Sequence, residues 1–166
     1  MEDRVDRGQT RFPRGRDQAA GRPHLVLLDR HRQHPGDDRG HARRRAWTAE
    51  DASGGWLDGG RHYRLTLPPD VPAKNFWSII VYDPQTRSLL QTSDRYPSLN
   101  SLTGTVAANA DGSIDLHFGP EPDEDHKSNW IGTTPGKGWF TILRLYGPLD
   151  PWFDKTWRPG EIEPID

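Results

Sequence analysis

The chain has 166 residues, a formal net charge of −2 and 32% hydrophobic residues. This length allows one domain with its own core, and the near-neutral charge gives no global signal for a nucleic-acid or membrane partner. The absence of cysteine excludes disulfides, thiolate chemistry and cysteine-containing zinc sites.

The first 45 residues differ in composition from the rest. They hold twelve Arg, no Lys, seven acidic residues and four of the seven His, and their one apolar cluster is 25–28. Such a segment buries too little apolar surface to offset its ordering entropy, which predicts disorder with one short strand or helical turn near 24–30. The composition is also typical of an out-of-frame reading of GC-rich DNA. We therefore interpret 1–45 as a disordered or artefactual tail and 46–166 as the domain.

Two other readings of this tail are weaker. A basic arm would bind nucleic acid or anionic lipid, but the interspersed acidic residues disfavour it. The four histidines lie in a stretch with no scaffold that would fix coordination geometry, so we expect no metal site there. No apolar run approaches the roughly 20 residues that span a bilayer.

The domain reads as strands and turns. Residues 62–67, "HYRLTL", alternate between apolar and polar positions, and Pro68-Pro69 ends this strand. "FWSIIVYD" (76–83) is a continuous apolar run closed by a turn at "DPQTR", and "SLLQT" (88–92) starts a returning strand. Residues 105–120 predict a hairpin with its turn at 109–112, in which Ile114, Leu116 and Phe118 share one face.

The last third contains the strongest predicted strand, "GWFTILRLYGP" (138–148). "LDPWFDKTW" predicts a helical turn capped by Asp150 with Pro151 at its first helical position. "RPGEIEPI" then returns as a closing strand or an extended tail. Strands at intervals of 8–12 residues with Gly and Pro turns predict an all-β antiparallel sandwich or barrel.

Several long motifs carry a family resemblance. They are "AKNFWSIIVYDPQTRSLLQT", "NADGSIDLHFGP" and "SNWIGTTPGKGWFTILRLYGPLDPWFDKTWRPGEIEPI". Residues 54–166 resemble the DUF1214 domain, which forms the C-terminal part of the DUF1254/DUF1214 proteins, mostly uncharacterised and bacterial. The resemblance implies a jelly-roll-like β-sandwich. In long members an N-terminal DUF1254 domain precedes it, which makes this chain a candidate truncated form and a DUF1254-type domain a candidate partner.

The stretch "PGKGWF" (135–140) resembles a phosphate loop only superficially. Its glycine spacing differs from G-x-x-x-x-G-K-[ST], and the motif opens a strand rather than a helix. We interpret it as a tight turn, although Lys137 retains the capacity to bind an anion.

The acidic stretch "EPDEDHKSN" (121–129) is interpreted as a solvated loop, with acid–base or hard-cation chemistry as the alternative.

Four residues remain as ligand-binding candidates: Trp130, Lys137, Arg144 and Tyr146. We expect Trp77, Trp139 and Phe140 to fill the core, while Trp130, Trp152 and Trp157 lie near turns. Arg144 interrupts an apolar strand, so it either pairs with Asp83 or Asp154 or grips an anion in a cleft.

The sequence therefore predicts an accessory module that binds a small polar ligand, a carbohydrate or another domain. We expect no cofactor, metal, nucleic acid or membrane. The alternative is a hydrolase-like enzyme whose cleft is lined by Trp130, Lys137, Arg144 and Tyr146. Convergence of these four side chains would distinguish the two hypotheses.

Overall fold

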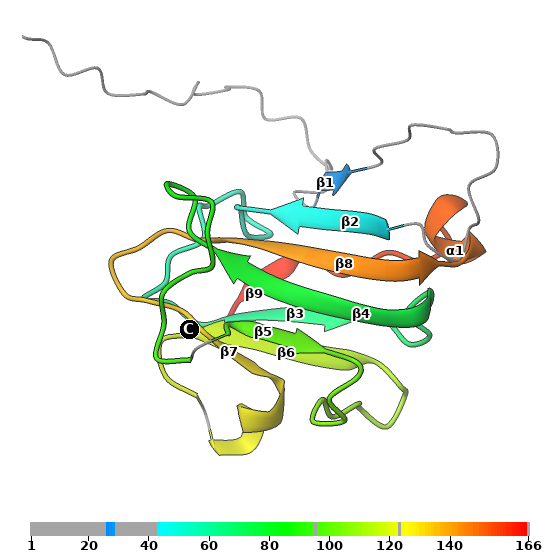
Figure 1. The fold of residues 1–166 in the computed structure, drawn as a ribbon. Coiled ribbons are helices and arrows are strands. Elements are labelled where there is room, and N and C mark those ends of the chain that lie inside the picture. The colour runs from blue at the N-terminus through cyan, green and yellow to red at the C-terminus, as the bar shows by residue number, and fades with distance from the viewer. Residues whose placement is uncertain (1–25, 29–42, 95, 123, 166) are drawn as a thin grey trace, which may run out of the picture.

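The computed structural model describes residues 26–28, 43–94, 96–122 and 124–165, whose strands form two sheets packed as two layers (Figure 1). The five-stranded sheet has the order β1 (Val26–Leu28), β2 (Arg43–Thr48), β8 (Phe140–Pro148), β4 (Ala73–Tyr82), β5 (Ser98–Asn100). The four-stranded sheet has the order β7 (Trp130–Gly132), β6 (Ile114–Gly119), β3 (Tyr63–Leu67), β9 (Ile162–Pro164). The predicted all-β sandwich is confirmed, with one parallel pair, β6–β7, among the described pairings.

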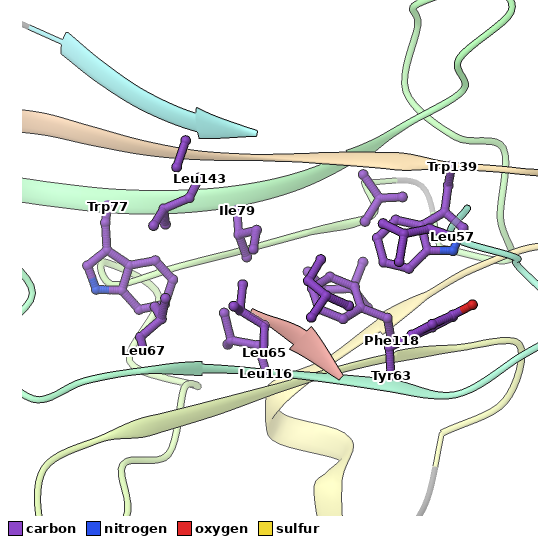
Figure 2. Packing of buried hydrophobic residues seen from close by; sticks show 14 of the residues in the cluster. Leu57, Tyr63, Leu65, Leu67, Trp77, Ile79, Leu116, Phe118, Trp139 and Leu143 are labelled. Atoms are coloured by element: carbon purple, nitrogen blue, oxygen red, sulfur yellow. The ribbon is translucent and has the colours of Figure 1, made fainter. Parts of the chain in front are cut away.

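The core lies between the two sheets, where inward side chains from both layers meet (Figure 2). Trp139 is 1% exposed, and its ring stacks on Phe118 at 5.0 Å and meets the edge of Tyr63 at 5.7 Å. Trp77 and Leu67 fill the other end of the same layer. Burial of side chains of this size stabilises the fold by about 1.5–3 kcal/mol each, so the core accounts for the face-to-face packing.

Side chains of β8 and β4 point alternately inward and outward, and this alternation determines which residues lie on each side of the five-stranded sheet. In β8 the buried positions Thr141, Leu143 and Leu145 point into the sandwich. The intervening positions of β8 and their register partners in β4 point outward, and all of them are half-buried except Ser78, which is buried. Phe140 is therefore on the outer side, unlike Trp77 and Trp139, which lie in the core as predicted.

The five-stranded sheet begins earlier than the composition suggests. Strand β2 starts at Arg43 and pairs with β8 in the register Arg45↔Arg144, so three residues assigned to the tail belong to this sheet. Strand β1 lies within the stretch where a short strand was one expectation, and it pairs with β2. The rest of the disorder prediction for 1–45 lies outside the described residues.

Two predicted strands are absent from the described structure. "SLLQT" forms one isolated bridge, Tyr82↔Leu89, because the chain leaves β4 in a turn held by the Asp83 carboxylate, which accepts hydrogen bonds from the amides of Gln85 and Thr86. The first half of the predicted 105–120 hairpin is not a strand either. There the backbone of Ala107 bonds the side-chain amide of Asn129 instead of a neighbouring strand, and β6 pairs with β3.

Two short helical segments complete the described chain. The 3-10 helix η1 (Glu124–Asn129) precedes β7, and the one-turn helix α1 (Asp150–Phe153) follows β8 (Figure 1). The predicted Asp150 cap is wrong, because Leu149 occupies the N-cap and no side chain caps the helix. Burial of Trp152 holds this turn in place instead. Among the described residues, no helix has the length and apolar character needed to cross a membrane.

Candidate functional site

The four predicted site residues fall in three places. Arg144 and Tyr146 occupy alternate positions of β8 and point outward from the five-stranded sheet. Lys137 lies in the loop between β7 and β8. Trp130 lies in β7 beside His117, on the outer side of the four-stranded sheet, with its ring 5.6 Å from that of His62. The four side chains therefore do not line one cleft, because Trp130 is on the opposite face of the sandwich.

The stretch that contains Lys137 is a turn, as predicted. Gly136 has φ +77°, a left-handed conformation that glycine adopts at low cost. The amide of Gly59 donates to the Lys137 carbonyl at 2.8 Å, which fastens this loop to the 57–60 turn. The ammonium Nζ of Lys137 lies 3.5 Å from Asp83 Oδ2. Amides of the following turn, and then Lys137, hold the pKa of Asp83 below its ordinary value.

Aromatic side chains surround Arg144 and Tyr146 on the outer face. Register places Phe76 beside Tyr146 and Tyr82 beside Phe140. The first pair stacks at 4.0 Å with an interplanar angle of 12°, and the second stacks at 5.2 Å and 19°. Trp47 from β2 meets Phe140 edge-on at 6.4 Å. These rings form two clusters on the outer side of β2, β8 and β4, and the pairs Ser78–Arg144 and Ile80–Ile142 lie between them.

Arginines are interleaved with these rings. The guanidinium of Arg43 lies 5.1 Å from the Tyr146 ring centre, and that of Arg144 lies 5.7 Å from the Tyr82 ring. Arg144 Nη2 also donates a 2.7 Å hydrogen bond to the Tyr82 hydroxyl. In the described structure the partner of Arg144 is thus a phenol and not Asp83 or Asp154. Cation–π contacts of this kind orient a guanidinium without neutralising its charge.

We name this surface the arginine–aromatic face. Its members are the outward positions of three adjacent strands: Arg43, Arg45, Trp47, Phe76, Ser78, Ile80, Tyr82, Phe140, Ile142, Arg144 and Tyr146. None of these described positions is acidic, and three of them are arginines. Most are half-buried, so the face is neither a closed core nor an ordinary polar surface. A face of this kind can bind an apolar partner that carries negative charge.

Sequence reasoning missed most of this face for two reasons. The run "FWSIIVYD" reads as continuously apolar, so its pattern does not separate the inward positions from the outward ones. Arg43 and Arg45 of this face were assigned to the tail by composition. The available signal is the spacing of Ile142, Arg144 and Tyr146, which occupy every second position of β8 and so share one side of the strand.

The fold and this face define the chain as a two-sheet β-sandwich domain with one arginine–aromatic outer surface. The family model described as "Protein of unknown function (DUF1214)" matches residues 43–150, and the chain belongs to this family. The match begins at the first residue of β2, so it includes the arginines of the face.

The solved structures that are similar to the chain include the following two proteins. The VPA0106 protein from Vibrio parahaemolyticus is 22% identical with a TM-score of 0.62, and the match covers 75% of this chain and 31% of that one. An uncharacterised protein from Burkholderia cenocepacia is 20% identical with a TM-score of 0.47, covering 78% of this chain and 31% of that one. The chain thus spans about a third of these proteins. A search of curated proteins finds no match.

Proposed function

We propose that this domain is an accessory module that docks through its arginine–aromatic face onto a DUF1254-type domain in a longer two-domain protein. The observation that carries the proposal is the outward row of stacked rings and arginines across β2, β8 and β4. Half-exposed apolar surface of this extent on one sheet is typical of a protein–protein contact. In the VPA0106 protein the matched region makes up about a third of a longer chain, which leaves length there for a further domain.

The chemistry of the partner follows from the charges. Arg43, Arg45 and Arg144 lie on the face without an acid among its described positions. A partner that buries this surface must supply carboxylates or carbonyl oxygens to these guanidinium groups, because unpaired buried charge is costly. We therefore expect an apolar patch with acidic residues at its rim.

Single-stranded nucleic acid also binds aromatic and arginine side chains on sheets. Two observations favour a protein partner instead. Phe76 and Tyr82 already stack on rings of β8, so their faces are used within the sheet. The whole chain also carries a net charge of −2, which gives weak attraction to a polyanion.

The test is to titrate a separately expressed DUF1254-type domain into the full chain by calorimetry. Ile142→Glu places a carboxylate at the centre of the face, and Ile165→Glu is a matched control beside β9. We expect Ile142→Glu to weaken binding roughly a hundredfold, or about 2.8 kcal/mol, and the control to bind like the wild type. Affinity should also fall as salt rises.

Two results would overturn this proposal. One is equal affinity of the two glutamate variants, which would place the contact elsewhere. The other is the absence of any complex with the wild type together with binding of a fluorescent thymidine 15-mer, which would assign the face to nucleic acid. The hydrolase alternative loses its support, because Trp130 lies on the opposite face from Arg144 and Tyr146, and Lys137 lies in the loop between β7 and β8.

A further inference from the structure

A second site lies on the opposite face of the molecule and is independent of the docking proposal. A pocket of about 200 Å³ opens between the outer side of the four-stranded sheet, helix η1 and the loop before β6. Its lining includes Arg64, Asp115 and His117 of the sheet, and Asp125, His126, Ser128 and Asn129 of the helix. Sequence reasoning treated 121–129 as a solvated loop and did not connect it with the sheet.

The pocket wall is held in position by hydrogen bonds. Asn129 is buried, and its side-chain amide donates to the carbonyls of Ala107 and Asp115 at 2.8 Å each while accepting from the Ala107 amide at 2.8 Å. One side chain thereby fixes the loop, the helix end and β6 relative to one another. A wall that is ordered before a ligand arrives reduces the entropy lost on binding.

The base of the pocket is polar and ordered in the same way. Asp115 accepts hydrogen bonds from the Thr66 hydroxyl and from Asn109 Nδ2. Burial would raise the pKa of this carboxyl, but these donors and the nearby positive charge outweigh burial and lower it. The base of the pocket therefore carries a fixed carboxylate whose two oxygens already accept hydrogen bonds from Thr66 and Asn109.

Two imidazole rings form one side of the pocket. His117 is buried on β6, and His126 of η1 stacks on it with a centroid distance of 4.0 Å and an interplanar angle of 26°. Together with the methyl groups of Ala107 and Ala108, these rings supply flat, weakly polar surface beside the hydrogen-bonding groups. A ligand with one polar edge and one C–H face fits such a wall.

The charges of the pocket argue against a simple anion site or metal site. The guanidinium of Arg64 is paired with Glu163 at 2.9 Å, and the two other charged groups, Asp115 and Asp125, are acidic. Within the described part of the chain, no group of three or more His, Asp or Glu side chains is arranged to hold a metal ion. The remaining chemistry is a mixture of hydroxyl, amide, imidazole and carboxylate groups that both donate and accept hydrogen bonds.

We propose that this pocket binds a small neutral polyhydroxylated ligand of monosaccharide size. Hydroxyl groups donate and accept at the same oxygen, which matches the mixed wall. The volume is below the roughly 300–1,000 Å³ typical of pockets for drug-sized molecules, which limits the ligand to a single small ring. Trp130 lies next to His117 in register, so the predicted aromatic borders this site although it does not line the pocket.

The experiment titrates ¹⁵N-labelled full chain with D-glucose, D-galactose and D-mannose, and in parallel with sodium acetate and sodium phosphate. We expect at least one sugar to give saturable shifts of the amides of Ala107, Ala108 and Asn129. His126→Ala should weaken that binding about tenfold, equivalent to about 1.4 kcal/mol. Ser128→Ala, which changes an exposed side chain, tests the same wall with less risk to folding, and Ser93→Ala is its matched control outside the pocket.

Three results would overturn the inference. The first is that none of the sugars shifts these amides. The second is that acetate or phosphate shifts them and the sugars do not, which would assign the pocket to anions. The third is that Ser128→Ala and His126→Ala both bind sugar as tightly as Ser93→Ala.

Discussion

The two outer faces of the sandwich are built on the same alternation but differ in chemistry. On the five-stranded sheet the outward positions are rings, aliphatic groups and arginines, while on the four-stranded sheet they include Arg64, Thr66, Asp115 and Glu163, which pair with one another. Polar side chains that pair with one another in this way can remain in water. The arginine–aromatic face is half-buried and rich in apolar surface, and this is the surface on which our proposal of a protein partner rests.

The largest predicted effect concerns the core that both faces share. Trp139→Ala removes a ring packed against Phe118 and Tyr63, and we expect a loss of about 3–5 kcal/mol of unfolding free energy. Urea unfolding followed by fluorescence measures it. Trp56→Ala is the matched control, because Trp56 is 68% exposed and its loss should change stability by less than about 0.5 kcal/mol. Equal effects of the two variants would contradict the assignment of the core.

The next prediction concerns a substitution that should disturb the outer side of the four-stranded sheet and leave the arginine–aromatic face unchanged. A Cβ at Gly119 would lie 2.5 Å from His62 Cδ2 and 2.7 Å from Trp130 Cη2, so Gly119→Ala should displace these rings and cost about 1–3 kcal/mol. Gly138→Ala is the control, since its Cβ would meet nothing closer than 3.6 Å. Chemical shifts of the variant should change around Trp130 and not around Tyr146. Changes spread over both faces would show that the two are coupled.

A double-mutant cycle tests the stacking on the arginine–aromatic face. Phe76→Ala and Tyr146→Ala should show a coupling energy of about 0.5–1.5 kcal/mol, because their rings stack in parallel. The coupling should be the same at low and high salt. A value near zero would mean that the two rings contribute independently.

The corresponding cycle on the polar face should give a smaller value. Arg64 and Glu163 form an ion pair whose side chains are 42% and 56% exposed, so we expect about 0.2–1 kcal/mol. Added salt should reduce this coupling, in contrast to the aromatic pair. A salt-independent value as large as that of the aromatic pair would contradict the comparison.

The pH dependence of stability tests the direction of the pKa shift of Asp115 on the polar face. The pKa of Asp115 is lowered in the folded state, so the unfolded chain takes up a proton more readily as pH falls. Its stabilisation is therefore present above its ordinary pKa of 3.8 and is lost on acidification, from about pH 5 downward. Thr66→Val removes one donor to Asp115, and its stability should fall less steeply below pH 5 than that of the wild type. A steeper fall would contradict the assigned role of Thr66.

The alternation of apolar and polar residues predicted the core strands from sequence. The buried residues stand at every second position, namely Tyr63, Leu65 and Leu67 in β3 and Leu116 and Phe118 in β6. The alternation could not predict which outward residues meet across strands. The stacking of Phe76 on Tyr146 depends on register between segments far apart in the chain, and the pocket depends on Asn129 reaching Ala107. The first three of the six residues of β2 are arginines, which carry no apolar signal. Strand β2 was therefore visible only through its pairing with β8.

The most direct test of the account uses isoleucine methyl NMR of the full chain with and without a DUF1254-type domain. Ile80 and Ile142 report on the arginine–aromatic face, and Ile165 reports on the region beside β9. We predict shifts or broadening of the Ile80 and Ile142 methyl signals while the Ile165 signal stays in place. Shifts at Ile165 alone, or no change in any of the three, would contradict it.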